Sequence, residues 1–282
     1  MVYIGTCSWK YDSWKGIIYP DEEKINYLRE YSKHYNTVEV DQWFWSLFDP
    51  KKVLLPKDTD VKAYNESTPD KFRFSLKIPN AITLTHFYNR DKKVPLKKNP
   101  HFFSPDIFDS FITSLKPLEK KLGPLMFQFE YLNKDKMRSL SEFIDRFEAF
   151  LELIDSKYLY GVELRNPNFL KKPFFEFLRR NKLVMVFLQG YYMPPVKSVF
   201  REFKDYINET VVIRLHGPDR SGIEKKTGGV WSKIVEPKDD ELTDVAGIVN
   251  YFKKKKADVY LNVNNHYEGS APLTINKIQK LL

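Results

Sequence analysis

The chain has 282 residues, of which 42% are hydrophobic, and its net charge is +9 from 46 basic and 37 acidic side chains. No run of about 18 apolar residues occurs, which argues against a membrane-spanning helix, and the first residues lead into a strand without the features of a signal peptide. The lone Cys7 excludes an internal disulfide and a cysteine-rich metal site. We therefore expect a soluble cytoplasmic protein with no membrane partner and a sizeable core.

The positive charge favours anionic partners. Phosphorylated metabolites and nucleic acids both suit such an excess. The excess is mostly lysine spread along the chain, however, and scattered lysines usually solvate a surface. Charge alone therefore makes a nucleic acid an alternative partner rather than the first expectation.

Strand-like and helix-like segments alternate along the whole sequence. The predicted strands are residues 3–7, 37–40, 72–78, 125–129, 158–164, 184–188, 211–216 and 259–263. The predicted helical segments are residues 22–35, 50–64, 106–122, 136–154, 173–181, 196–206, 239–255 and 271–281.

This alternation predicts the α/β class and a single (β/α)8 TIM-barrel domain over residues 1–282. An elaborated loop after the third strand, residues 89–100, interrupts it. An open doubly wound sheet is the alternative, but no glycine-rich phosphate-binding turn follows the first strand. A half-exposed antiparallel sheet would not need a helix after nearly every strand.

Charged side chains recur on one face of several strands. Successive residues of a strand point to opposite faces, so Glu39, Glu163, Arg165, Arg214 and His216 lie opposite their apolar neighbours. Barrel enzymes carry their chemistry at the C-terminal ends of the strands. Uncompensated buried charge costs several kcal/mol, so stability alone rarely selects such a cluster. The pattern therefore predicts an active site.

Several short motifs lie in the same order as in a known family. They are Gly5-Thr6-Cys7-Ser8-Trp9, Thr37-Val38-Glu39-Val40, Phe72-Arg73-Phe74-Ser75-Leu76-Lys77, Leu122-Gly123-Pro124, Glu163-Leu164-Arg165-Asn166-Pro167, Arg214-Leu215-His216-Gly217 and Asn264-Asn265. Together they resemble the YecE-like family, domain-of-unknown-function family 72. The resemblance implies a TIM barrel and brings no settled reaction. Its likeness to xylose-isomerase-like barrels and apurinic endonucleases is fold-level analogy.

The sequence departs from this family at the ends of the first two strands. Asp41 stands where the family commonly has asparagine, and Cys7-Ser8 replaces a more usual Ser-Gly pair. We expect the mouth beside the second strand to suit a different ligand.

The two glutamates are the first catalytic candidates. Glu39 and Glu163 suit an acid–base pair, a nucleophile with its acid, or metal ligation. Alternatively, Arg165, Arg214 and Lys77 neutralise them in a structural network. The same three cations suit a phosphate or carboxylate, because guanidinium groups bind such anions with two parallel hydrogen bonds.

His216 and His86 are the histidines best placed for proton transfer or metal ligation. Two histidines are too few for a multinuclear zinc site, so we predict no metal site and no cofactor, with a single divalent cation on oxygen ligands as the alternative. Further predicted substrate-binding residues are Gln128, Asn264, Asn265, Trp9 and Trp14. The tryptophans suit stacking on a sugar ring or a base, or packing of the loops.

Three functions follow from these residues. The first is a cytoplasmic isomerase or hydrolase acting on a small anionic substrate that contains a sugar or a phosphate. The second is a nucleic-acid-binding or endonuclease-like barrel, and the third is a ligand-binding protein without chemistry. The sequence predicts no particular oligomeric state.

Overall fold

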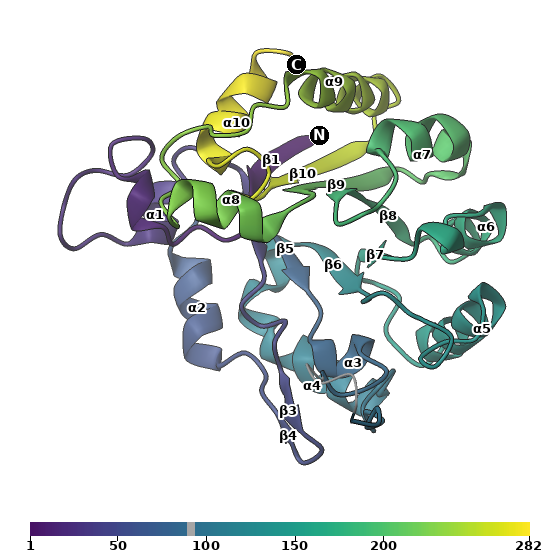
Figure 1. The fold of residues 1–282 in the computed structure, drawn as a ribbon. Coiled ribbons are helices and arrows are strands. Elements are labelled where there is room, and N and C mark those ends of the chain that lie inside the picture. The colour runs from purple at the N-terminus through teal and green to yellow at the C-terminus, as the bar shows by residue number, and fades with distance from the viewer. Residues whose placement is uncertain (89–93) are drawn as a thin grey trace.

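Eight parallel strands form a nearly closed barrel in the computed structural model, which describes residues 1–88 and 94–282 (Figure 1). The strands are β1 (Val2–Thr6), β2 (Thr37–Val40), β5 (Arg73–Lys77), β6 (Leu122–Gln128), β7 (Tyr160–Glu163), β8 (Val184–Gly190), β9 (Thr210–Gly217) and β10 (Asp258–Val263). They pair in the order β1-β10-β9-β8-β7-β6-β5-β2. The predicted α/β barrel is confirmed.

Helices surround the strands (Figure 1). They are α1 (Tyr27–Tyr31), α2 (Asp58–Glu66), α3 (Asn80–Thr83), α4 (Pro105–Ser114), α5 (Leu140–Leu151), α6 (Lys172–Arg180), α7 (Val196–Phe203), α8 (Arg220–Thr227), α9 (Asp239–Lys254) and α10 (Ala271–Gln279). In α6, for example, Phe174 and Phe177 are buried while Arg179 and Arg180 face solvent, which is the amphipathic pattern that packs a helix on a sheet. Within the described part of the chain, no helix is both long and apolar enough to cross a bilayer.

The first predicted helix, residues 22–35, is too long. The structure confines it to α1, because the side chain of Asn26 caps the helix by accepting a hydrogen bond from the Arg29 N–H at 3.1 Å. Asparagine is among the residues most favoured at the N-cap, the position that starts a helix. The sequence also gave no prediction of α8, which follows β9.

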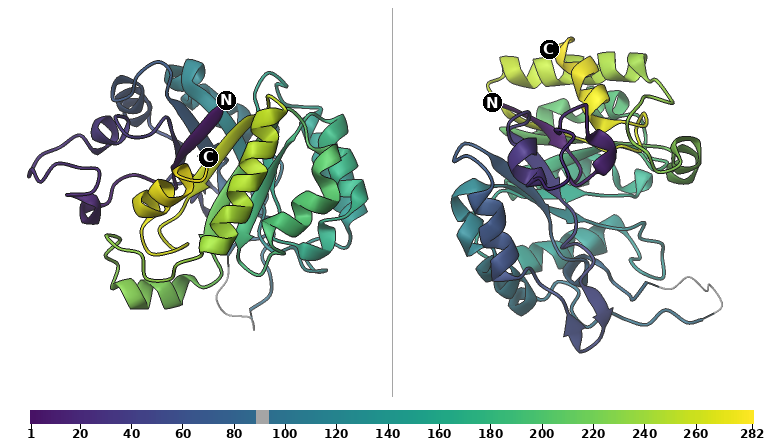
Figure 2. Two further views of the ribbon diagram at one scale, coloured as in Figure 1. Left: turned by 90° about the horizontal axis from the view of Figure 1, so that it is seen from above. Right: turned by 90° about the vertical axis from the view of Figure 1, so that its left-hand side faces the viewer.

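A β-hairpin replaces the start of the predicted helical segment 50–64. Its strands are β3 (Leu47–Asp49) and β4 (Lys52–Val53), and it extends away from the barrel (Figure 1, Figure 2). Asp49 accepts the Lys51 N–H at 2.8 Å, a side-chain turn that aspartate forms readily. The helix begins only at Asp58. Residues 89–93 of the predicted loop 89–100 lie outside the described residues.

The barrel interior is apolar below the C-terminal ends of the strands. Tyr3, Met126, Val186 and Val212 pack there, and the ring of Tyr3 stacks on that of Tyr260 with centroids 4.5 Å apart. This layer fills the barrel as side chains do in TIM barrels. The charged residues at the C-terminal ends of the strands therefore lie on top of this apolar layer.

Two side chains complete the seam between β1 and β2. The Asn36 amide accepts the Ile4 N–H at 2.9 Å and donates to the Val2 carbonyl at 3.0 Å. The Tyr31 hydroxyl accepts the Thr6 N–H at 2.7 Å and donates to the Thr37 carbonyl at 3.0 Å. Direct backbone pairing resumes where the Ser8 N–H meets the Glu39 carbonyl at 2.9 Å. Side chains thus satisfy main-chain groups that strand pairing satisfies elsewhere.

We predict that Tyr31→Phe lowers the free energy of unfolding by about 1–3 kcal/mol, because it leaves a buried N–H and a buried carbonyl without partners. Chemical denaturation measures the change. Tyr35→Phe is the matched control, since Tyr35 is also buried and its hydroxyl has no hydrogen-bond partner among the described residues. Equal losses in the two variants would contradict this account of the seam.

Candidate active site

A single guanidinium group joins two glutamates at the C-terminal end of the barrel. Arg214 on β9 donates to both carboxylate oxygens of Glu39 on β2, through Nε at 2.7 Å and Nη2 at 2.6 Å. Its Nη1 donates to Glu163 on β7 and to Gln128 Oε1 on β6, the latter at 3.3 Å. Arg214, Glu39 and Glu163 are all buried. Residues from four strands thus meet at one point, as the sequence predicts.

Two further cations lie outside this group. Arg165 Nε donates to Glu163 Oε1 at 3.1 Å, and Lys77 Nζ lies 3.5 Å from Glu39 Oε1. Lys77 also lies over the ring of Phe44, 5.6 Å from its centroid. Three cations therefore face two carboxylates in this cluster, and Asp41 adds a third acidic group beside Lys77.

The cations keep both carboxyl groups ionised. Burial would raise the pKa of Glu39, but the charges of Arg214 and Lys77 outweigh burial and hold it below its usual value. The pKa of Glu163 is lowered in the same way, with Arg214 and Arg165 opposing the effect of burial. Opposite charges at such distances favour the ionised form.

His216 stays neutral beside this cluster. Burial, followed by the charges of Arg214 and Lys77, holds the pKa of His216 well below its usual value. Its Nε2 lies 3.6 Å from the Cys7 sulfur, and its Nδ1 lies 3.3 Å from the Tyr191 hydroxyl. A neutral imidazole at a strand end has one ring nitrogen able to accept a proton.

Tyr191 is a site residue that sequence reasoning missed. It follows β8 with φ of 52°, directly after Gly190 with φ of 129°, and a left-handed backbone is rare for an aromatic residue. This conformation places the Tyr191 ring over the Arg165 guanidinium, 4.5 Å from the centroid. Such strain often marks a functional site. Only the position directly after a barrel strand could have indicated Tyr191 from the sequence.

The cluster opens into a cavity of about 360 Å³. The end of each barrel strand, or the loop that follows it, contributes to the lining. In strand order these residues are Tyr11, Asp41, Lys77, Gln128, Arg165, Tyr191, His216 and Asn264. Burial raises the pKa of Asp41, although Lys77 opposes the effect. We call this cavity the mouth cavity. It holds five of the residues that the sequence predicts, namely Lys77, Gln128, Arg165, His216 and Asn264, and adds Tyr11, Asp41 and Tyr191.

The structure places four predicted site residues away from the mouth cavity. Trp14 is buried in the core, and Trp9 packs edge-on against Tyr64 with ring centroids 5.0 Å apart. Asn265 accepts the Ala271 N–H at 2.9 Å at the start of α10. His86 lines a separate cavity. The tryptophans therefore pack the loops, which was one of the two interpretations of their position.

Three buried side chains could converge on a metal ion. The Cys7 sulfur, a Glu39 oxygen and a His216 nitrogen all lie within 4.8 Å of one another. However, burial raises the pKa of the Cys7 thiol well above its usual value, and both Glu39 oxygens already accept hydrogen bonds from Arg214. A cation here would compete with two fixed positive charges, so the triad fits a metal poorly.

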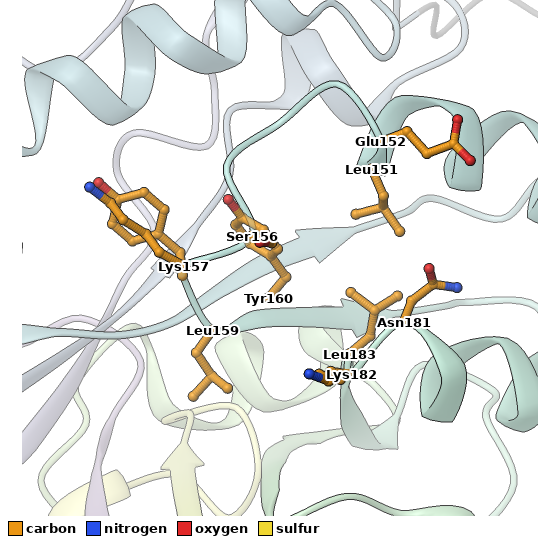
Figure 3. A pocket seen from close by; sticks show the side chains of 10 residues that line it. Leu151, Glu152, Ser156, Lys157, Leu159, Tyr160, Asn181, Lys182 and Leu183 are labelled. Atoms are coloured by element: carbon orange, nitrogen blue, oxygen red, sulfur yellow. The ribbon is translucent and has the colours of Figure 1, made fainter.

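A cavity of about 410 Å³ lies at the opposite end of the barrel. Figure 3 shows its side chains, which come from the end of α5 and from the segments leading into β7 and β8. Its Lys157 pairs with Glu119 at 3.0 Å. This end of a TIM barrel contributes to stability rather than catalysis, so the mouth cavity is the better candidate.

Residues 3–282 match the family described as "Protein of unknown function DUF72". The chain belongs to the DUF72 family. A crystal structure of a DUF72 protein from Thermotoga maritima MSB8 is 19% identical with a TM-score of 0.71, and the match covers 100% of this chain and 98% of that chain. One from Enterococcus faecalis V583 is 20% identical with a TM-score of 0.68, covering 100% and 95%. Both likenesses show the fold.

A curated relative is UPF0759 protein YecE from Escherichia coli K12. It is 27% identical over 173 residues, which is 61% of this chain and 51% of YecE. The match therefore spans about half the length of that relative. The resemblance seen in the sequence motifs is confirmed.

We predict that Arg214→Met lowers the free energy of unfolding by about 3–5 kcal/mol, because it leaves two buried carboxylates without their main partner. Chemical denaturation at neutral pH measures the loss. Adding Glu39→Gln and Glu163→Gln should recover part of it. Arg180→Met is the control: Arg180 pairs with Glu148 at 2.7 Å on the surface, and its loss should cost less than about 1 kcal/mol. Equal losses would contradict the central role of Arg214.

We predict that His216 makes stability depend on pH. The folded chain keeps this imidazole neutral, whereas the unfolded chain takes up a proton below about pH 6.5. The stabilising contribution is therefore complete above that pH and falls below it. Burial also lowers the pKa of His86 and His266, so only part of the wild-type slope belongs to His216.

His216→Asn should lose less stability than wild type between about pH 7.5 and pH 5.5, and one proton changes the slope by at most about 1.4 kcal/mol per pH unit. Denaturation at several pH values measures it. Identical slopes would show that the fold does not lower the pKa of His216.

Proposed function

We propose that this chain is an enzyme that transfers a proton on a small anionic, sugar-containing substrate bound in the mouth cavity. One observation carries the proposal: each of the eight barrel strands, through its C-terminal end or the loop that follows it, contributes a polar or charged residue to a single cavity. This is where TIM-barrel enzymes hold their catalytic residues. Isomerases and hydrolases both need such proton transfer.

Arg165 and Lys77 are the proposed anion-binding residues. Arg165 uses Nε for Glu163, and its two Nη atoms have no hydrogen-bond partner among the described residues. The ammonium of Lys77 has Glu39 as its ion-pair partner at 3.5 Å. Both side chains line the mouth cavity. A guanidinium edge together with an ammonium group suits a phosphate or a carboxylate.

His216 and Asp41 are the proposed proton-transfer groups. The neutral imidazole is a base, and the raised pKa of Asp41, caused by burial, brings that carboxyl group toward the range useful for acid catalysis. Glu39 and Glu163 were predicted to move protons themselves. We propose instead that they hold Arg214 and Arg165 in place, because their carboxylates are engaged by guanidinium groups and their pKa values are lowered.

Aromatic side chains support a sugar-containing substrate. Trp45 and Tyr88 line the mouth cavity, yet their side chains are 62% and 69% exposed. Exposed rings beside polar groups are suited to stacking on the apolar face of a sugar. This part of the cavity lies beside β2, where the sequence departs from its family pattern.

The test is a panel of sugar phosphates and sugar acids incubated with the protein in deuterated water. Proton NMR detects deuterium entering a carbon position, which identifies an isomerase, and new products identify a hydrolase. For a converted substrate, His216→Asn should lower kcat by about 10²–10⁴-fold. Arg165→Met should mainly raise KM, because it removes a binding contact. His34→Asn, which changes an exposed histidine, should leave both unchanged.

Two outcomes would overturn this proposal. One is full activity in His216→Asn with a converted substrate. The other is no conversion across the panel together with steeply salt-dependent binding of single-stranded DNA or RNA, which would favour the nucleic-acid alternative. A retained metabolite that is never converted would favour a binding protein.

A further inference from the structure

A second cavity, of about 210 Å³, lies beside the mouth cavity. We call it the lateral cavity. It is formed by the segment after β5 and by the residues that lead into α5. Its cationic residues are Lys98, Lys134, Lys136, Arg138 and Arg146, and its acidic residues are Asp135 and Glu142. The lining therefore has a marked excess of positive charge.

Most of these cations lack an acidic partner. Lys136 pairs with Glu130 at 2.5 Å, and Arg146 lies 3.8 Å from Glu142. Within the described part of the chain, Lys98, Lys134 and Arg138 form no ion pair. Unpaired cations that share one cavity repel each other, and a bound anion relieves that repulsion.

Glu142, in the first turn of α5, already accepts a hydrogen bond from the backbone. Glu142 accepts the Arg138 N–H at 2.9 Å, and the Ser139 hydroxyl accepts the Glu142 N–H at 3.1 Å. This arrangement is close to a capping box, except that Glu142 accepts from the residue before the N-cap Ser139. Glu142 is therefore held against the backbone by the helix cap. The N-terminus of this twelve-residue helix adds positive potential at the same place.

One of the residues that line the lateral cavity is a buried histidine. His86 is 9% exposed, and its Nδ1 lies 2.9 Å from the Thr85 hydroxyl. Its Nε2 has no partner among the residues that the structure describes. Burial, followed by the charge of Lys136, lowers the pKa of this imidazole. His86 Nε2 thus offers a further polar contact to a ligand.

We propose that the lateral cavity is a second anion site, which binds a phosphoryl group. Three unpaired cations suit the double charge of a phosphate better than the single charge of a carboxylate. The proposal predicts binding, not chemistry, and it stands independently of the mouth cavity's reaction.

The two cavities share a wall. Leu84 and Tyr88 line the mouth cavity, whereas Thr85 and His86 between them line the lateral cavity. The ion pair of Lys136 with Glu130 crosses the same boundary, since Glu130 lines the mouth cavity. A phosphorylated ligand could therefore place its phosphate in one cavity and its remainder in the other.

The test is calorimetric titration of the full chain with inorganic phosphate at about 0.15 M salt, where nonspecific surface attraction is screened. The double variant Lys134→Ala/Arg138→Ala should bind phosphate at least about tenfold more weakly than wild type. The matched control is Arg179→Ala/Lys204→Ala. It removes the same charges from a cavity at the opposite end of the barrel and should change affinity less than about twofold.

Ribose 5-phosphate distinguishes the sources of the phosphoryl group. Tighter binding of ribose 5-phosphate than of phosphate, weakened by Arg165→Met, identifies a ligand that reaches both cavities. Equal binding of the two probes identifies free phosphate, and the lateral site stands in both cases.

Unchanged phosphate affinity in Lys134→Ala/Arg138→Ala, or equal losses in both double variants, would overturn the lateral site. Phosphate binding that only Arg165→Met removes would also overturn it, while leaving the mouth-cavity proposal supported.

Discussion

The contact of Arg214 with two glutamates is the interaction on which the C-terminal end of the barrel depends. The three side chains come from strands far apart in the sequence, and all three are buried. Breaking such a buried pair costs far more than forming it gains. The contact therefore fixes how β2, β7 and β9 lie relative to one another at their C-terminal ends. It also sets the pKa values of the groups around it, so one guanidinium links the barrel's shape to its electrostatics.

The proposed preference of the cavity for an anion rests on Arg165 and Lys77. Each of them pairs with one glutamate of the Arg214 cluster, and both line the cavity. Burial, together with the positive charges of the cluster, keeps His216 neutral. A base held neutral next to fixed positive charge is suited to removing a proton from a substrate whose negative charge those cations stabilise. The same cations would thus bind the substrate and stabilise the negative charge that forms when the proton is removed.

Strand periodicity predicted the barrel and most of the cluster, because alternation forces Glu39, Glu163 and Arg214 inward whatever the loops do. Loop residues could not be predicted in this way. Tyr191 depends on a left-handed backbone, and Asp41 depends on the burial of a loop carboxyl group. The hairpin after β2 was missed because the segment was assigned from its helical propensity. A side-chain turn at Asp49 decides its structure instead. Local hydrogen bonds to the backbone override propensity at such places.

The seam between β1 and β2 has a consequence for how the barrel is held closed. Elsewhere in the sheet, neighbouring strands hold one another, but here a phenol from α1 and an amide from the following turn take that role. The first strand is therefore fastened to the second through a helix on the outside. Loosening α1 would free the amide hydrogens of Ile4 and Thr6 to exchange with solvent, so the barrel has a built-in place from which it would begin to open.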